Sequence, residues 1–127
     1  MAEAVLDTSA VLAFLWSEPG GEIVAELVPR SIISAVNLAE VITKLVDRWV
    51  GAEGLEETAR LLSGQVEAVS LQTGVAAGLL HAKTRGRGVS LGDRFCLALA
   101  QEAGLPVYTA DRAWTELGLD LDIRLIR

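Results

Sequence analysis

The chain has 127 residues, 51% of them hydrophobic, which is enough to bury the core of one domain without disulfides. Its only cysteine, Cys96, excludes an internal disulfide and suits a reducing compartment. The formal net charge of −6 argues against a protein that holds nucleic acid by bulk electrostatic attraction, but not against an enzyme that meets phosphates through bound cations.

Short apolar runs alternate with longer helical patterns along the chain, and no linker or repeat interrupts them. This alternation predicts a single α/β domain over residues 1–127 with a mainly parallel sheet of four to five strands. The first half is predicted to contain a strand at 4–6, a helix at 10–16, a short helix at 22–28, a strand at 31–33 and a helix at 35–50. The second half is predicted to contain a helix at 55–62, a strand at 67–71, a helix at 73–83, a helix at 90–103, a strand at 106–109, a short helix near 114–117 and an edge strand at 123–126.

None of the apolar runs approaches the roughly 20 residues that a helix needs to cross a bilayer. The N-terminal segment has no basic region and reaches an acid early, at Asp7, which is unlike a secretory signal. We therefore expect a cytoplasmic protein that does not enter a membrane.

Several acids fall where an open parallel sheet places its ligand site. Asp7 follows the first strand and Asp111 follows the fourth, and the carboxyl ends of parallel strands share one edge of the sheet. Asp93 lies in the first turn of a helix whose N-terminus points to the same edge. Glu40 lies two turns into an earlier helix, so the sheet-edge argument supports its place near the other three acids least. We expect these four side chains to form one acidic cluster.

Each acid also has a purely structural interpretation. Asp7 and Asp111 can cap the helices that follow them, and the segment Ser90-Leu91-Gly92-Asp93 resembles a capping box with Asp in place of Glu. Glu40 shares a polar helix stripe with Lys44, four residues later, and can pair with it in solvent. The residues alone leave both interpretations open.

A cluster of carboxylates favours a hard divalent cation. Two carboxylates about 5 Å apart repel by roughly 3 kcal/mol at an effective dielectric constant of about 20. Four of them at one edge therefore need a cation or partial protonation. Oxygen ligands select Mg²⁺ or Mn²⁺, and a single histidine with a single cysteine argues against zinc. Such an ion can hold a phosphodiester, polarise it and lower the pKa of an attacking water.

Four segments together resemble the PIN-domain ribonucleases, and in particular the VapC-type toxins of toxin–antitoxin pairs. The segments are Val5-Leu6-Asp7-Thr8-Ser9-Ala10, Ser34-Ala35-Val36-Asn37-Leu38-Ala39-Glu40-Val41, Leu91-Gly92-Asp93-Arg94 and Tyr108-Thr109-Ala110-Asp111. They occur in the family's order and span nearly the whole chain. The resemblance implies a three-layer α/β/α fold, an acidic pocket for Mg²⁺ or Mn²⁺, and endonucleolytic cleavage of RNA. It also implies a homodimer and a small antitoxin as partner.

The resemblance assigns roles residue by residue. The catalytic acids and metal ligands that carry over by motif match are Asp7, Glu40, Asp93 and Asp111. A hydroxyl from Thr8 or Ser9 is expected beside the first Asp, and Asn37 shares a helical face with Glu40 and is a candidate supporting residue. Arg94 either points inward, where it can offset acid charge or contact phosphate, or lies on the helix surface.

Two other functions remain open from the sequence. A catalytically silent PIN-like module would keep the acids only to bind a partner. An aspartate-based phosphatase or phosphotransfer domain has the same general architecture. Haloacid-dehalogenase-like phosphatases, however, carry a second Asp two residues after the first, and Ser9 stands at that position here.

Two further groups of residues lie outside these assignments. The basic loop from Lys83 to Arg87 either follows an RNA backbone or is simply solvated. Trp16 and Trp49 fall on apolar helix faces, so we expect them in the core or in an interface rather than stacked on bases.

Overall fold

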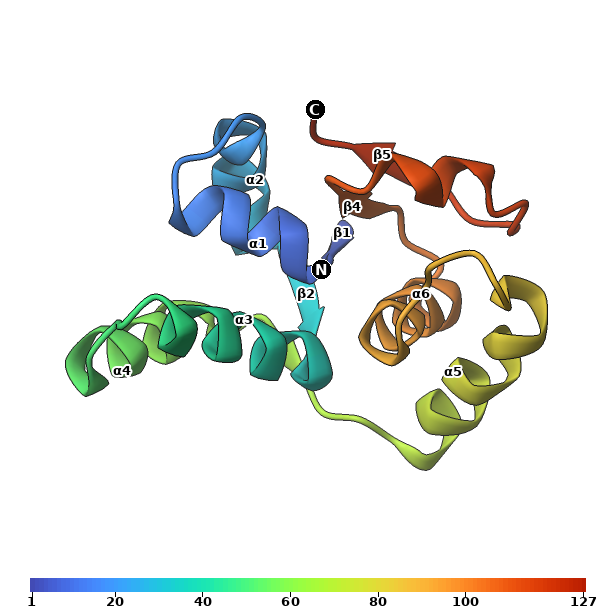
Figure 1. Cartoon of the computed structure of the whole chain (residues 1–127), viewed down its shortest axis with the longest axis horizontal. Helices are drawn as coiled ribbons and strands as arrows, with labels where there is room; N and C mark the ends of the chain where they lie inside the picture. Colours follow the sequence, from blue (N-terminus) through green and yellow to red (C-terminus); the bar gives the residue numbers. More distant parts are fainter.

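A five-stranded parallel sheet lies at the centre of the computed structural model, which describes all 127 residues (Figure 1). The strand order is β3-β2-β1-β4-β5, and every neighbouring pair is parallel. The strands are β1 (Ala4–Leu6), β2 (Ser31–Ser34), β3 (Val66–Glu67), β4 (Val107–Thr109) and β5 (Ile123–Leu125). The predicted parallel sheet of four to five strands is confirmed.

Helices cover both faces of this sheet. They are α1 (Thr8–Leu15), α2 (Gly21–Leu27), α3 (Ala35–Asp47), α4 (Ala52–Leu62), α5 (Leu71–Thr84) and α6 (Leu91–Ala103), with short 3₁₀ segments at Val28–Arg30 and Arg112–Glu116. Figure 1 shows α1 to α4 on one side of the strands and α5 with α6 on the other. None of these helices combines the length and hydrophobicity that crossing a bilayer would require.

The strands bury both of their faces, because successive side chains point to opposite sides of a sheet. Leu6 and Ile33 lie in the core that α1 to α4 cover. Val5 and Val107 lie in the second core, which α5 and α6 cover. All four side chains have no measurable exposure. The three-layer α/β/α architecture is therefore confirmed.

The direction of chain progression across the sheet reverses beside β1. The chain passes from β1 to β2 on one side, whereas β4 pairs with β1 on the other side. Ligands of open α/β sheets bind beyond the carboxyl ends of the strands at such a reversal. Asp7 and Asp111 follow the ends of β1 and β4, so they flank this position.

Several predicted boundaries were wrong for local reasons. The strand expected at 67–71 is reduced to Val66–Glu67, because the Ser70 hydroxyl accepts the Thr73 N–H and caps α5. Helix α4 begins at Ala52 rather than at residue 55. Helix α3 ends at Asp47 rather than near residue 50, and Trp49 just beyond it has a φ of +63°.

Trp49 does not lie in the core. Its side chain is 93% exposed, so of the two expected locations, core and interface, the structure excludes the first and does not test the second. Trp16 fits the expectation, because it packs partly buried against the core and lies under the Arg48 guanidinium at 3.7 Å from the ring centroid.

Candidate active site

Asp7 is the most buried of the four acids, with only 4% of its surface exposed. It caps α1, and its Oδ1 accepts the Ala10 N–H at 2.8 Å. The Ser9 hydroxyl donates to Oδ1 at 2.7 Å, and the Thr109 hydroxyl donates to Oδ2 at 2.6 Å. Burial raises the pKa of Asp7 from 3.8 to about 6, with a smaller contribution from Asp93, although these hydrogen bonds oppose the shift.

The expected hydroxyl beside Asp7 is Ser9, and a second one comes from Thr109, which sequence reasoning missed. Thr109 is fully buried at the end of β4, and its Oγ1 also accepts the Asp111 N–H at 3.0 Å. The Ser9 hydroxyl oxygen accepts the Ala110 N–H at 2.9 Å. These contacts join the start of α1 to the end of β4. Thr109 reaches Asp7 because β4 pairs with β1. The order of the strands along the sequence does not reveal this pairing, so Thr109 could not be identified from the sequence.

Glu40 is held inside the cluster rather than in solvent. Its Oε1 accepts hydrogen bonds from the Thr8 hydroxyl at 2.7 Å and from Asn37 Nδ2 at 2.8 Å. No ion pair joins it to Lys44, so the solvent-exposed pair considered from the sequence does not form. Asn37 is 1% exposed and its Nδ2 also donates to the Gly92 carbonyl at 3.1 Å. The supporting role expected for Asn37 therefore has a geometric basis.

Asp93 caps a helix and also lies near other acids of the cluster. It completes a capping box at the start of α6, in which its carboxylate accepts the Ser90 N–H and the Ser90 hydroxyl accepts the Asp93 N–H. Burial raises the pKa of Asp93, and the charges of Glu40 and Asp111 contribute to the shift. A single residue thus caps the helix and faces two other acids.

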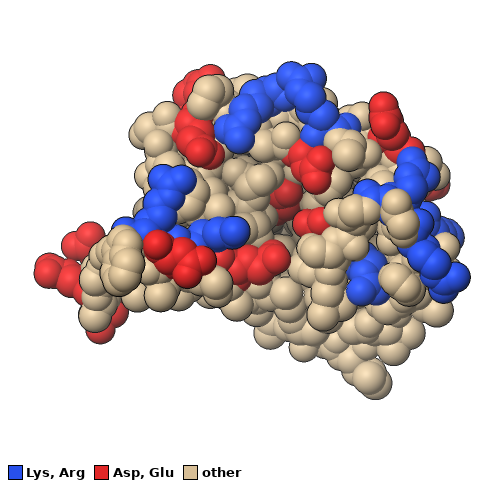
Figure 2. All heavy atoms as spheres, in the orientation of Figure 1, with Lys and Arg blue, Asp and Glu red and all other residues tan.

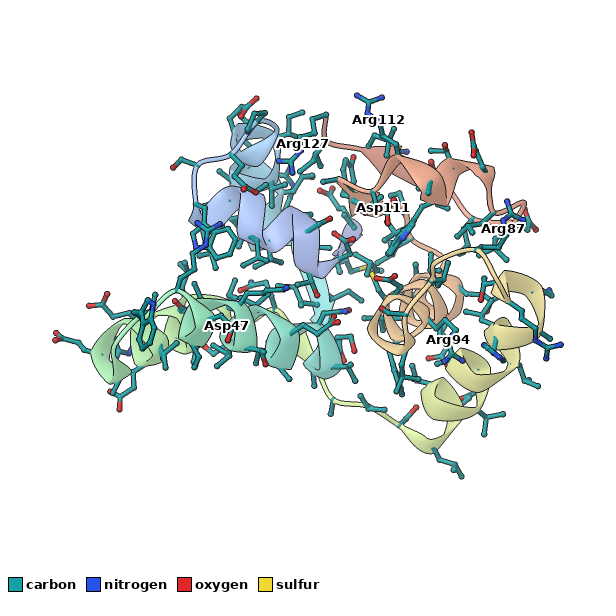
Figure 3. All side chains as sticks on the ribbon, in the orientation of Figure 1. Asp47, Arg87, Arg94, Asp111, Arg112 and Arg127 are labelled. Atoms are coloured by element: carbon teal, nitrogen blue, oxygen red, sulfur yellow. The ribbon has the colours of Figure 1, made fainter.

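Asp111 and Arg94 are placed at the margin of the cluster. Asp111 is exposed and caps the 3₁₀ segment after it, because its Oδ1 accepts the Ala113 N–H at 3.0 Å. Arg94 is turned toward α5, where its Nη1 donates to the Ala77 carbonyl at 3.2 Å (Figure 3). Arg94 forms no ion pair with a carboxylate, so the structure favours packing between α5 and α6 over charge compensation in the cluster.

The acids converge on one region of the surface. Figure 2 shows Asp and Glu atoms in a hollow near the middle of this face, with Lys and Arg atoms on both sides of it. Burial raises the pKa of the Cys96 thiol beneath them, and the charges of Asp7, Asp93 and Glu40 all contribute. Cys96 itself is free and fully buried, as expected for a packing residue. The residues of the basic loop lie farther out, where Arg87 donates to the Glu116 carbonyl (Figure 3).

The donor set suits a hard cation, although the side chains do not form a finished ligand shell. No group of three or more Asp, Glu, His or Cys side chains is arranged to hold a metal ion together. Each acid is instead directed toward donors of its own chain. Mg²⁺ commonly uses one or two carboxylates and completes its coordination with water. Asn37 Oδ1 is buried without a hydrogen-bond partner, so one polar atom beside Glu40 is unsatisfied in this structure.

Comparison with known proteins agrees with this geometry. The family model described as PIN domain matches residues 4–119. A Mycobacterium tuberculosis protein named Ribonuclease VapC42 is 34% identical over 122 residues, which cover 81% of this chain and 86% of the relative. The Mycobacterium bovis VapC ribonuclease Mb2780c matches with the same identity and coverage. The chain belongs to the PIN-domain family.

Solved structures share the fold of this PIN domain. A toxin–antitoxin complex from Klebsiella pneumoniae contains a chain with a TM-score of 0.78 and 18% identity, covering 98% of both chains. A chain of the DNA-bound VapBC complex from Salmonella typhimurium has a TM-score of 0.72 and 20% identity, and the match covers all of both chains. VapC20 of Mycobacterium tuberculosis, described as a sarcin-ricin loop cleaving toxin, has a TM-score of 0.72 and 21% identity. The match covers 96% of this chain and 99% of that one. At these identities the likeness concerns the fold.

Thr109 provides a test of the hydrogen bonds around Asp7. Thr109→Val keeps the side-chain shape but removes the donor to Asp7 and the acceptor of the Asp111 N–H. Because that donor lowers the pKa of Asp7, its loss should raise this pKa further and move the acidic limb of a pH–rate profile to higher pH. Rates of RNA cleavage measured across roughly pH 5 to 9 check this expectation.

The matched control is Thr58→Val. The Thr58 hydroxyl donates to the Gly54 carbonyl inside α4, which takes no part in the acid cluster. An identical pH–rate profile for Thr109→Val and Thr58→Val would show that Thr109 has no influence on Asp7.

Proposed function

We propose that this PIN domain is a metal-dependent endoribonuclease, the toxin of a toxin–antitoxin pair. The observation that carries the proposal is the gathering of Asp7, Glu40, Asp93 and Asp111 from separate segments at one sheet edge, around a carboxyl whose pKa is raised by burial. Such a raised pKa reflects the energetic cost of keeping unneutralised charge at this position. A bound cation offsets that cost.

In this proposal the four acids would hold Mg²⁺ or Mn²⁺, either directly or through its water ligands. The ion would supply Lewis acidity toward the scissile phosphate and lower the pKa of an attacking water. Ser9 and Thr109 orient the Asp7 carboxylate, and Thr8 and Asn37 orient Glu40. Because such an ion would activate the water, the proposal requires no histidine base, and His81, in the last turn of α5, has no assigned role.

The partners follow from the same proposal. The curated relatives are named VapC ribonucleases, and solved structures of the same fold include toxin–antitoxin complexes. We propose RNA as substrate, a small antitoxin as inhibitor and a homodimer as the working assembly, all in the cytoplasm. Apolar side chains of α5 support an assembly of some kind, since Leu71, Val75 and Leu79 are 88%, 56% and 70% exposed.

The test is cleavage of cellular RNA by the purified chain. We expect internal fragments in Mg²⁺ or Mn²⁺, loss of cleavage in a chelator and recovery when Mn²⁺ is restored. In cells, expression of the chain alone should arrest growth, and co-expression of the neighbouring small gene product should relieve it. A chain that neither cleaves RNA nor binds Mn²⁺ in calorimetry would instead be the catalytically silent module.

A further inference from the structure

Gly92 occupies a position at which any side chain would collide with Glu40. It is the buried second residue of α6, immediately before Asp93. A Cβ built on Gly92 would lie 2.5 Å from both Cδ and Oε1 of Glu40, which is closer than real Cβ contacts allow. The Glu40 carboxylate therefore fills the space that a side chain at residue 92 would take.

The backbone of Gly92 takes part in holding the same carboxylate. Asn37 Nδ2 donates both to Glu40 Oε1 at 2.8 Å and to the Gly92 carbonyl at 3.1 Å. Thr8, at the start of α1, donates to the same Oε1 atom. One carboxylate thus connects α1, α3 and α6, and its close approach to α6 depends on the absence of a Cβ.

We propose that Gly92 is a positioning residue that seats the Glu40 carboxylate beside Asp93 and thereby sets the affinity of the acid cluster for a divalent cation. This inference rests on the proposed function, because it assumes that the cluster binds Mg²⁺ or Mn²⁺. Gly92 acts through Glu40 and touches neither the cation nor the RNA.

The geometry separates this role from a role in folding. The three nearest atoms that an added Cβ would meet all belong to the far end of the Glu40 side chain. Gly92→Ala should therefore fold, with Glu40 rotated away from Thr8 and Asn37. Ala is also a better helix former than Gly, which helps to preserve α6.

The first experiment measures Mn²⁺ binding by calorimetry together with thermal unfolding. Gly92→Ala should lower Mn²⁺ affinity by roughly 10–100-fold, the range usual for supporting residues of metal sites, while the unfolding temperature changes little. The matched control is Gly78→Ala in α5, where an added Cβ would meet nothing within 4 Å. This control should bind Mn²⁺ as the wild type does.

The second experiment repeats the substitution in a Glu40→Ala background, where the carboxylate that the added Cβ would meet is absent, and thermal unfolding checks that both variants fold. Gly92→Ala should then cause no further loss of Mn²⁺ affinity, because the residue through which it acts is gone. An undiminished loss in this background, or wild-type affinity in the single variant, would overturn the positioning role. If the wild-type chain itself binds no Mn²⁺ and cleaves no RNA, the proposed function fails as well, and the two failures are thus distinguished.

Discussion

Asp7→Asn should greatly slow RNA cleavage and at the same time stabilise the folded chain at pH 8. Asn keeps the volume of Asp and an oxygen that can accept the Ala10 N–H, so the cap of α1 is retained. The substitution removes the carboxylate charge that the proposed cation would use. A catalytic metal ion supplies several kcal/mol of transition-state stabilisation, so we expect its loss to slow cleavage by roughly 10³-fold.

The stability change follows from the raised pKa of Asp7, which burial moves from 3.8 to about 6. Between these values the folded state binds more protons than the unfolded state, so the stability of the wild type falls as pH rises through this window. Above about pH 6 the full shift corresponds to about 3 kcal/mol of lost stability. Asp7→Asn should recover most of this lost stability at pH 8. Near pH 3 it should recover none, because Asp7 is protonated in both the folded and the unfolded state there.

Thermal unfolding in a chelator at both pH values measures this effect. A gain on the order of 10 °C at pH 8 is expected for a chain of this length. The control is Asp120→Asn, which removes the same charge from an exposed loop and should leave cleavage intact. Addition of Mn²⁺ should stabilise the wild type and not Asp7→Asn, because only the wild type gains binding energy from the ion. Equal stability of Asp7→Asn and wild type at pH 8 would contradict the burial argument.

A set of variants around Ser90 and Asp93 should separate helix capping from catalysis. Asp93→Asn keeps an acceptor for the Ser90 N–H but loses the charge, so cleavage should fall by roughly 10³-fold with little change in stability. Ser90→Ala removes the acceptor of the Asp93 N–H but keeps the acid, so stability should fall by about 1 kcal/mol while most activity remains.

Cleavage assays and urea unfolding of the two variants provide the comparison. If Asp93 serves only as a cap, Asp93→Asn should cleave RNA at the wild-type rate, and our assignment would be wrong. If the catalytic role of Asp93 depends on the helix cap that it forms with Ser90, Ser90→Ala should lose as much activity as Asp93→Asn.

The positions of the strands and the ends of α6 can be predicted from local sequence. The apolar runs around Val5 and Val107 predict buried strands because a parallel sheet covered on both faces needs continuous hydrophobic segments. The capping box at Ser90 and the glycine cap at Gly104, which has a φ of +66°, set the ends of α6 through contacts only a few residues apart. Both ends of this helix were predicted correctly for that reason.

Other features depend on partners that are distant along the chain. Thr109 reaches Asp7 across 102 residues, and Asn37 reaches Gly92 across 55. Asn37 lies on the polar stripe of α3 and is nevertheless 1% exposed, because α6 packs against α3 there. No local pattern distinguishes a polar residue that faces water from one that faces another helix.

By itself, the sequence determined the alternation of strands and helices, the sheet-edge placement of Asp7 and Asp111, and, through four short motifs, the resemblance to PIN-domain ribonucleases. Hydrophobic periodicity and capping act within a few residues, so they can be recognised without a structure. Only the tertiary structure decided that Glu40 lies near Asp93, that Ser9 and Thr109 donate to Asp7, and that a Cβ added at Gly92 would meet the Glu40 carboxylate. The order β3-β2-β1-β4-β5 and the packing of α3 against α6 bring these residues together, and both arise from long-range contacts.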